Sequence, residues 1–455
     1  MYNAPIGLID VLLGLLVILI IIIIGNSKRS KLGDAPHAIY YMRNIYFKLL
    51  FASVFGAIYI YYYGGADTTA YWRGAEKLNN LLWQSPTDYF AEMISEPIAE
   101  NIVLRFNSTT GYPPIWIYAD DGSFFVSKIL SVFMIFCGQS YLVLTLVMGY
   151  VTAIASWKVF ELVRSYKITT DWFAALSILF IPSVGFWCAG ISKDTIVLVS
   201  VFYLLHHLFG IANKTVKSRG RSLLLVLLFG WILYSTRSFM LFTVAAPIAL
   251  ALSTRLAKQY KESAVLKNIL RFFILFIGFG GFLIFLRYQG EVFAKTTNEY
   301  LTEAAIQQDD FANNKSYGDK RYDLEITDYS PFGMLKVAPR AILTAFYRPG
   351  IWEARSPLLL ISGLETTLFI YLTLIFIFKG NLARKIRVIR NNELLIFSIL
   401  FALILGFFAG FTSGLFGVLV RFKAPLLPFL LIVLTTSSAK TKIETEEKEL
   451  ETGNS

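Results

Sequence analysis

Long apolar segments recur along the whole chain, and they constrain its fold more than any other feature. Windows of about 19 residues reveal roughly eleven of them. Hydrophobic residues make up 56% of the 455 residues and charged residues 16%, more apolar surface than a soluble core needs. The sequence therefore predicts an all-α polytopic integral membrane protein. The expected spans are residues 6–25, 45–63, 141–163, 172–187, 195–210, 223–236, 239–252, 272–286, 358–378, 394–411 and 424–438.

Basic residues gather in alternate short loops, after the first, fifth, seventh and ninth segments, which is typical of cytoplasmic loops. This distribution accounts for the formal net charge of +11, so no nucleic-acid partner is expected. An odd number of spans then predicts an outside N-terminus and a cytoplasmic C-terminus. The first segment carries Asp10 and lacks a basic n-region and a cleavage site, so it is expected to be a retained anchor.

This topology places two long polar segments outside, at about residues 64–140 and 287–357. Loops of this length are more often functional than spacers, and these two are expected to carry short interfacial helices. No repeat or second domain is recognisable, so residues 1–439 are predicted to form one transmembrane domain. The charged tail, residues 440–455, is expected to be cytoplasmic and disordered.

The last apolar hairpin ends in charge. Arg421 and Lys423 precede the segment 424–438, whose helix would be about 22 Å long against a hydrocarbon core of ~30 Å. Both cations are therefore expected at or inside the membrane boundary. Cations placed there snorkel, form ion pairs or hold an anion such as a lipid-borne phosphate, and the last option indicates chemistry on lipid-linked substrates.

A second group of cations enters the outer surface around a Pro-Gly turn. Arg340, Arg348 and Arg355 lie where topology disfavours positive charge. Because the planar guanidinium binds phosphate oxygens in pairs, these side chains are candidates for holding a pyrophosphate leaving group. The alternatives are anchoring to lipid headgroups or pairing with Glu353. Glu365, about two turns into its span, requires a buried partner, for which Arg340 or Arg348 is a candidate.

Asp67 is the first carboxylate after the second apolar segment, where Gly64 and Gly65 end the helix. A carboxylate there could act as a general base on a sugar hydroxyl, which contributes about 10² to 10⁴ in rate. The structural alternative is an N-cap for an interfacial helix starting at Thr68, and the two roles are compatible.

Aromatic side chains next to acids occur in both outer segments. Such groups suit a sugar ligand, and they equally suit the aromatic belt of a membrane protein. Two adjacent aspartates in the first segment could recruit a divalent cation, and no other cofactor is indicated. The sugar-contacting candidates are Tyr71, Tyr112, Trp116, Tyr118, Asp120, Asp121, Trp352 and Glu353.

Two cations in short turns belong to the same expected rim. Lys193 precedes Asp194, with which it could form a pair that caps the next helix, and Arg237 occupies the corresponding turn of the next hairpin. Each alone is expected to be structural, but together with Arg421 and Lys423 they would line one face. Two cysteines in apolar sequence and three scattered histidines indicate neither a disulfide framework nor a zinc site.

Three motifs resemble a known group of membrane proteins: Phe-Trp-x-x-Gly-x-x-Lys-Asp within residues 182–194, Tyr-Arg-Pro-x-x-Trp-Glu-Ala at 347–354, and Gly-x-x-x-Arg-x-Lys-x-x-x-x-Pro-Phe at 417–429. They are similar to polytopic proteins of bacterial surface-polysaccharide clusters, whose broader relatives look like GT-C type glycosyltransferases and O-antigen polymerases. The resemblance covers about half of the chain.

The resemblance implies transfer of a sugar or oligosaccharide from a polyprenyl phosphate or pyrophosphate carrier to a glycan acceptor, at the outer face of the bacterial inner membrane. It implies that Asp67 matches the acidic residue of the first outer loop in GT-C enzymes, and that Arg348, Arg355 and Arg421 lie near the lipid phosphate. The chain departs from that pattern by placing a full span before Asp67. The alternatives are a flippase or transporter of lipid-linked glycans and a non-catalytic component of an assembly complex, and the oligomeric state stays open.

Overall fold

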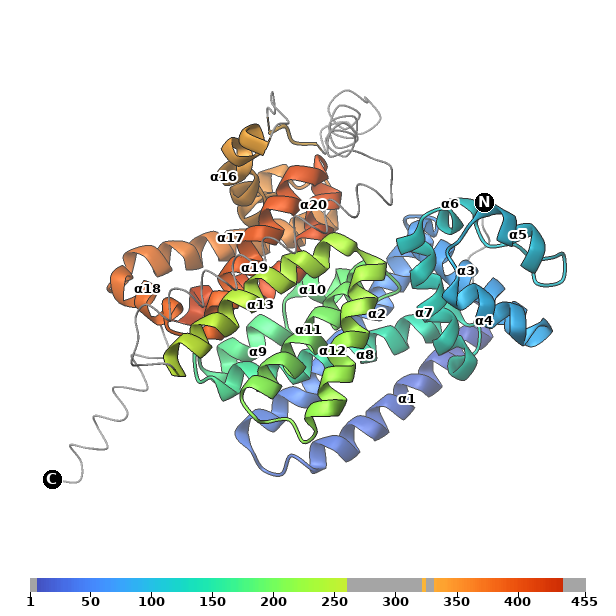
Figure 1. Ribbon diagram of the computed structural model, residues 1–455, viewed down its shortest axis with the longest axis horizontal. Helices are drawn as coiled ribbons and strands as arrows, with labels where there is room; N and C mark the ends of the chain where they lie inside the picture. The colour runs from blue at the N-terminus through green and yellow to red at the C-terminus, as the bar shows by residue number, and fades with distance from the viewer. Residues whose placement is uncertain (1–5, 260–320, 325–330, 437–455) are drawn as a thin grey trace. The chain divides into compact units, whose positions relative to one another are not determined.

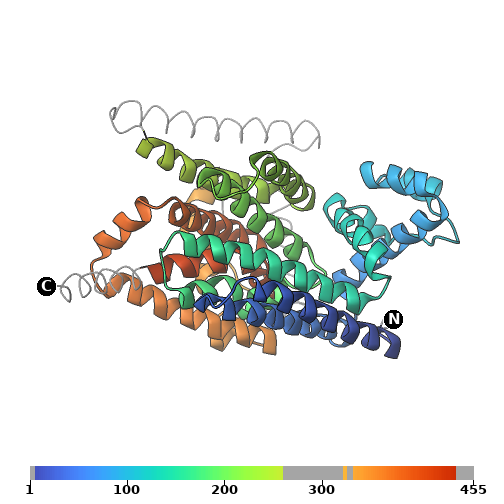
Figure 2. The same cartoon turned by 90° about the horizontal axis from the view of Figure 1, so that it is seen from below.

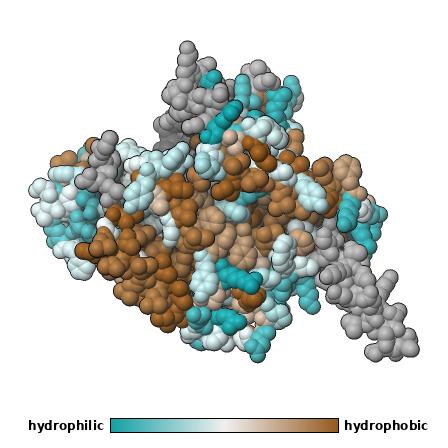
Figure 3. Space-filling model, turned by 180° about the vertical axis from the view of Figure 1, so that it is seen from behind, coloured by the Kyte–Doolittle hydropathy of each residue, from teal (hydrophilic) through white to brown (hydrophobic). Residues whose placement is uncertain are grey.

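The computed structural model describes residues 6–259, 321–324 and 331–436 (Figure 1). Within these ranges every extended regular element is a helix, apart from an isolated β-bridge between Arg321 and Leu415. Apolar side chains are exposed over broad areas of the face in Figure 3, as expected for helices that contact lipid. The expected all-α architecture is confirmed for the described residues, and the chain is a multi-pass membrane protein.

Eight segments of the described residues are long and apolar enough to cross a membrane, and each overlaps an expected span. They are Leu8–Ser30, Pro36–Tyr61, Tyr141–Ser165, Lys193–Ala212, Ser238–Arg255, Pro357–Phe378, Glu393–Ser413 and Phe416–Thr436.

The other three expected spans have different outcomes. Residues 172–187 form no continuous span but two short helices, α9 (Asp171–Leu179) and α10 (Pro182–Trp187), because Pro182 lacks the N–H that would extend α9. Residues 223–236 belong to α12 (Arg219–Thr236), which begins with charged Arg219 and Arg221 and does not reach the same apolar average. Residues 272–286 lie outside the described ranges. The total of eleven spans therefore stays a prediction.

The chain divides into two compact units. Unit 1 comprises residues 1–162 and 178–241, and unit 2 comprises residues 163–177 and 242–455. This division does not test the predicted single transmembrane domain over residues 1–439. The expected tail at 440–455 and most of the expected outer segment at 287–357 lie outside the described residues.

Unit 1 begins with α1 (Leu8–Ser30), which packs on α2 (Ile39–Tyr61) (Figure 2). The opposite side of α1 exposes leucine and isoleucine side chains along its length. The helices α8 (Tyr141–Ser165) and α11 (Lys193–Ala212) are largely buried, and α11 packs against α12.

The segment at 64–140 in unit 1 is mostly helical. It contains α3 (Ala66–Gln84), α4 (Pro86–Ile94), α5 (Ala99–Arg105), α6 (Ile115–Tyr118) and α7 (Asp121–Cys137). Figures 1 and 2 both show α3 to α6 together at one end of unit 1. The chain turns into α3 at Gly65, whose φ of 105° suits glycine, and a Cβ there would lie 2.4 Å from the Thr69 hydroxyl. Leu78 of α3 and Phe124 of α7 belong to one hydrophobic core.

In unit 2, the loop that follows α16 and contains Arg348 lies beside the last two expected spans, residues 394–411 and 424–438. Its described helices include most of α13 (Ser238–Gln259), α16 (Pro331–Tyr347), α17 (Pro357–Phe378), α18 (Leu382–Arg390), α19 (Glu393–Ser413) and α20 (Phe416–Phe422). The backbones of α16 and α19 approach closely because Gly410 has no side chain: a Cβ there would lie 2.0 Å from the Ala341 carbonyl oxygen. Gly406, one turn earlier, faces the Phe346 ring in the same way.

Candidate functional site

Lys423 lies in the turn after α20, and only 1% of its surface is exposed. Its Nζ donates to the Arg348 carbonyl oxygen (2.6 Å) and to the Thr366 hydroxyl of α17 (3.3 Å). It also interacts electrostatically with Glu365, so Lys423 is one charge partner of that acid. Three sequence segments with predicted roles thus meet within unit 2. We call Arg348, Glu353, Glu365, Thr366 and Lys423 the Lys423 cluster.

The Arg348 guanidinium is held on two sides. Its Nε donates to Glu353 Oε1 (2.9 Å) and its Nη2 contacts the same oxygen, while Glu353 Oε2 accepts from the Gly350 N–H (2.7 Å). The guanidinium carbon lies 5.5 Å from the centroid of the Tyr322 ring and 5.0 Å from that of Phe416. No residue that the structure describes accepts a hydrogen bond from Nη1, and 37% of the side chain is exposed. Arg348 is therefore fixed in place while still presenting donors.

Tyr322 fixes one of those rings. Its hydroxyl donates to the Gly410 carbonyl oxygen (2.9 Å) and its N–H to the Gly414 carbonyl oxygen (2.9 Å). Burial is the main reason that the pKa of Tyr322 lies above its ordinary value, so its hydroxyl stays protonated and the ring carries no charge opposing Arg348.

The other predicted residues of unit 2 lie nearer the surface. Arg355 is exposed and forms no ion pair with any described residue. Arg340 is also exposed and donates from Nη1 to the Leu324 carbonyl oxygen (3.0 Å), and Arg421 is partly buried at the end of α20. Trp352 is 77% exposed, with its ring over Gly350. Arg348 and Arg355 thus offer the guanidinium donors of this loop.

Unit 1 gathers a second set of charges, the Asp194 cluster, which consists of Asp120, Ser123, Lys193, Asp194 and Arg237. Asp194 is fully buried and forms an ion pair with Arg237 (2.8 Å). Lys193 forms an ion pair with Asp120 (2.8 Å), which also accepts from the Ser123 hydroxyl (2.5 Å). The predicted cap was wrong: the N-cap of α11 is Ser192, whose hydroxyl accepts from the Thr195 N–H (3.1 Å). The Asp194 cluster thus pairs the first residues of α11 with the residue that precedes α7 and the residue that follows α12.

The pKa values of the two adjacent aspartates are shifted in opposite directions. Burial would raise the pKa of Asp120, but hydrogen bonds from Lys193 and Ser123 bring it below its ordinary value. Burial, together with the charges of Glu96 and Asp120, raises the pKa of Asp121. No group of three potential metal ligands occurs among the described residues, so a divalent cation at these aspartates stays a prediction.

Asp67 lies in the first turn of α3 and is partly buried. The helix begins at Ala66 with Gly65 as its N-cap, so the expected N-cap role of Asp67 for a helix from Thr68 was wrong. Because Asp67 belongs to unit 1 and Arg348 and Arg421 belong to unit 2, their predicted convergence in one outer cavity is untested and stays a prediction.

The predicted sugar-contacting aromatics divide into buried and exposed side chains. Tyr71 and Tyr118 are 3% and 1% exposed, so neither presents a surface to a ligand, which corrects that expectation. Tyr118 instead donates to Glu92 Oε1 (2.9 Å), and burial, aided by Glu92, raises the pKa of its hydroxyl. Tyr112 and Trp116 are each 54% exposed, in agreement with either a sugar contact or a membrane-interface role.

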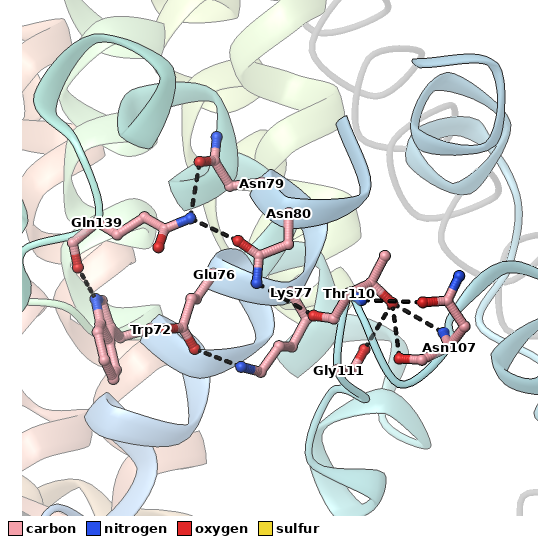
Figure 4. A network of polar contacts seen from close by, with 9 residues as sticks. All are labelled: Trp72, Glu76, Lys77, Asn79, Asn80, Asn107, Thr110, Gly111 and Gln139. Atoms are coloured by element: carbon pink, nitrogen blue, oxygen red, sulfur yellow. Dashed lines mark hydrogen bonds and ion pairs between the residues drawn. The ribbon is translucent and has the colours of Figure 1, made fainter. Parts of the chain in front are cut away.

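A polar network links α3 to two loops (Figure 4). Gln139 Nε2 donates to Asn79 Oδ1 (3.1 Å) and Asn80 Oδ1 (2.8 Å). The backbone carbonyl oxygen of Gln139 accepts from the Trp72 indole N–H (2.8 Å). Asn80 Nδ2 donates in turn to the Thr110 carbonyl oxygen (3.2 Å). Asn79 Nδ2 is buried and donates to no described residue. The network fixes the loop that leads to Tyr112 and Trp116.

Sequence reasoning missed this network, because amides spaced along a loop and a helix carry no signal of their own. It also missed Lys48, a fully buried cation in α2 whose Nζ has no hydrogen-bond partner among the described residues. A charged residue within an apolar span is a detectable signal, and Lys48 could have been singled out in that way. Comparison of the chain with protein-family models, curated proteins and solved structures found no match.

Proposed function

We propose that this protein is a membrane-embedded transferase that moves a sugar or oligosaccharide from a polyprenyl phosphate or pyrophosphate carrier to a glycan acceptor. The observation that carries the proposal is the arrangement of Arg348. Glu353 and two aromatic rings hold its guanidinium, and Nη1 has no acceptor among the described residues. A guanidinium in this state is suited to bind phosphate oxygens.

Lys423 supports this role from beneath the loop. Its bond to the Arg348 carbonyl oxygen ties the loop to the buried turn after α20. A cation that is already fixed needs little reorganisation when charge develops on a leaving phosphate, so it stabilises the transition state more than a mobile side chain does. Arg355, exposed in the same loop, would provide a second set of donors to the carrier.

In this proposal Asp67 deprotonates or orients the acceptor hydroxyl, and the carrier phosphate leaves with the electron pair of its bond to the sugar. Carrier activation makes a nucleotide unnecessary. Tyr112 and Trp116 would provide flat apolar faces for sugar rings. The site, on this proposal, opens to the outer face of the bacterial inner membrane.

A second candidate is a flippase for lipid-linked glycans, favoured by interrupted helices. The chain breaks between α9 and α10 at Pro182, and the last span changes to a 3-10 turn at Ala424–Leu426 after Lys423. Discontinuous helices are typical of transporters.

The experiment combines the purified protein with a synthetic polyprenyl-pyrophosphate oligosaccharide and a glycan acceptor. We expect covalent product, which Arg348→Ala should reduce by about 10² to 10³ and Asp67→Asn by about 10² to 10⁴. Arg29→Ala, an exposed arginine at the end of α1, is the matched control and should retain full activity. Unchanged product with well-folded Arg348→Ala contradicts the proposal, and translocation into vesicles without product supports the flippase.

A further inference from the structure

The helix α18 is a short, strongly cationic connection between α17 and α19. Its nine residues contain four cations and no acid, and Leu382 and Ile386 expose apolar side chains beside them. Such a helix, basic on one side and apolar on another, is typical of segments that lie in the membrane interface.

One of its cations has a structural role. Lys385 is 8% exposed, and its Nζ contacts the carbonyl oxygens of Phe376 (2.5 Å) and Lys379 at the end of α17. These carbonyl groups have no partner within α17, so Lys385 caps that helix and ties α18 to it.

Two other cations line a cavity. The cavity has a volume of about 650 Å³ and lies among α13, α18 and α19 of unit 2. Its polar lining consists of Thr254, Arg387, Arg390 and Asn391, and its apolar lining includes Ile386 and Ile396. Its volume falls within the usual range for small-ligand sites, about 300 to 1,000 Å³.

No acid among the described residues forms an ion pair with Arg387 or Arg390, the two arginines of this cavity. The nearest acid in sequence, Glu393, accepts from Arg255 (3.2 Å) and from the Tyr166 hydroxyl (3.2 Å). The two arginines therefore favour an anionic occupant.

The cavity is remote from the Lys423 cluster. Glu365 and Thr366 lie in the first half of α17, whereas α18 follows its last residue, Phe378. Thr366 and Phe378 are 12 residues apart, about 18 Å along the axis of α17. The cavity therefore lies beyond the end of α17 that is farther from the Lys423 cluster.

We propose that this cavity binds the phosphate headgroup of an anionic phospholipid, with Arg387 and Arg390 as the phosphate donors. Ile386 and Ile396 provide the apolar wall along which the first part of the acyl chains lies. Anionic headgroups are attracted to basic interfacial helices, and paired arginines add directional hydrogen bonds to that attraction. This site is separate from the proposed carrier site and does not depend on it.

The test measures lipid binding to the full chain in detergent by native mass spectrometry, with phosphatidylglycerol, phosphatidylcholine and inorganic phosphate as probes. We expect wild-type protein to retain phosphatidylglycerol in preference to phosphatidylcholine. The double variant Arg387→Gln/Arg390→Gln should lose about fivefold in phosphatidylglycerol affinity for each arginine removed. The double variant Arg387→Lys/Arg390→Lys keeps both charges but loses the planar guanidinium groups. Its phosphatidylglycerol affinity should lie between those of the wild type and the glutamine double variant.

Arg384→Gln is the matched control, because it removes a cation of the same helix that does not line the cavity. A loss of lipid affinity in this variant as large as the loss per arginine in the glutamine double variant, or no preference of the wild type for the anionic lipid, overturns the proposal. Competition by inorganic phosphate at the concentration of the lipid would also overturn it, since the site would then bind a free anion. If the glutamine variants do not fold, the lysine variant gives the same decision.

Discussion

The Asp194 cluster and the Lys423 cluster both contain cation–acid pairs, but they differ in the hydrogen-bond donors that they leave exposed. In the Asp194 cluster each named cation has an acid at 2.8 Å, so the charges neutralise one another across helices. In the Lys423 cluster the buried ammonium donates to a carbonyl and a hydroxyl oxygen, and Arg348 keeps Nη1 without a described acceptor. The first arrangement stabilises a fold, whereas the second leaves donors for a ligand.

The comparison indicates where stability and function should separate under mutation. Breaking a buried pair should destabilise unit 1, because the remaining charge is left without its partner in a medium of low dielectric constant. Altering the exposed side of the Lys423 cluster should instead leave the fold intact and change ligand binding.

The largest effect is expected from Asp194→Asn. It removes the acid of a pair in which Asp194 is fully buried and the Arg237 side chain is 12% exposed, so unfolding should become easier by about 3 to 5 kcal/mol. Thermal unfolding in detergent measures the change. Asp120→Asn is the matched control, since its pair is 55% exposed at the acid and should cost below about 1 kcal/mol. Equal losses of stability in both variants would show that burial does not determine the cost of breaking an ion pair.

Lys423→Met should have the next largest effect. Methionine has an apolar side chain of similar length, but it leaves Glu365 without this cation. We therefore expect the free energy of unfolding, measured by thermal unfolding, to fall by about 3 kcal/mol. Adding Glu365→Gln should recover more than about 1 kcal/mol, because the acid is then neutral. Thr366→Val removes only the 3.3 Å bond and should cost about 1 kcal/mol. A double variant no more stable than Lys423→Met would contradict the coupling between Glu365 and Lys423.

Much of the fold could be predicted from hydropathy, because a helix that crosses lipid must be apolar over its whole length. The eight spans of the described residues each match an expected segment. The exception at residues 172–187 has a local cause, since averaging over a window ignores the break that Pro182 makes. The helices within 64–140 were expected only in outline, because amphipathic helices lack a continuous apolar run.

The candidate site could be predicted only in part. A charge within or beside an apolar span requires a partner, and this rule singled out Glu365 and Lys423. The partner itself was not predictable, because Lys423 uses a backbone carbonyl oxygen 75 residues away along the chain. Tyr322, which flanks Arg348, carried no motif, and its anchor at Gly410 is 88 residues distant. Contacts of this kind depend on how helices pack.

Glu353→Gln tests the Lys423 cluster through its function. It weakens the tether of Arg348 without removing the arginine, so unfolding should change by no more than about 1 kcal/mol. In the transfer assay we expect a loss of about tenfold, smaller than that of Arg348→Ala, because a displaced guanidinium still carries its charge. A loss as large as that of Arg348→Ala would mean that Glu353 contacts the reacting groups itself.

The smallest effect concerns pH and the adjacent aspartates of unit 1. The pKa of Asp120 is lowered in the folded protein, so its stabilisation is complete above the ordinary value of about 3.9 and is lost as the pH falls through the folded pKa. The pKa of Asp121 is raised, so its ionised form opposes folding. At pH 7, Asp120→Asn should lower the thermal midpoint by of order 1 °C and Asp121→Asn should raise it.

Both differences should disappear as the pH falls through the folded pKa of each aspartate, because the protonated carboxyl group and the asparagine that replaces it are then both neutral. Each variant is a control for the other, because the two residues are neighbours and the expected shifts have opposite signs. A nonspecific effect of removing a carboxylate would shift the thermal midpoint of both variants in one direction. If both variants shift the midpoint in the same direction at pH 7, the Lys193 and Ser123 hydrogen bonds do not control the charge of Asp120. Stabilising charge pairing in the Asp194 cluster would then be limited to Asp194 and Arg237.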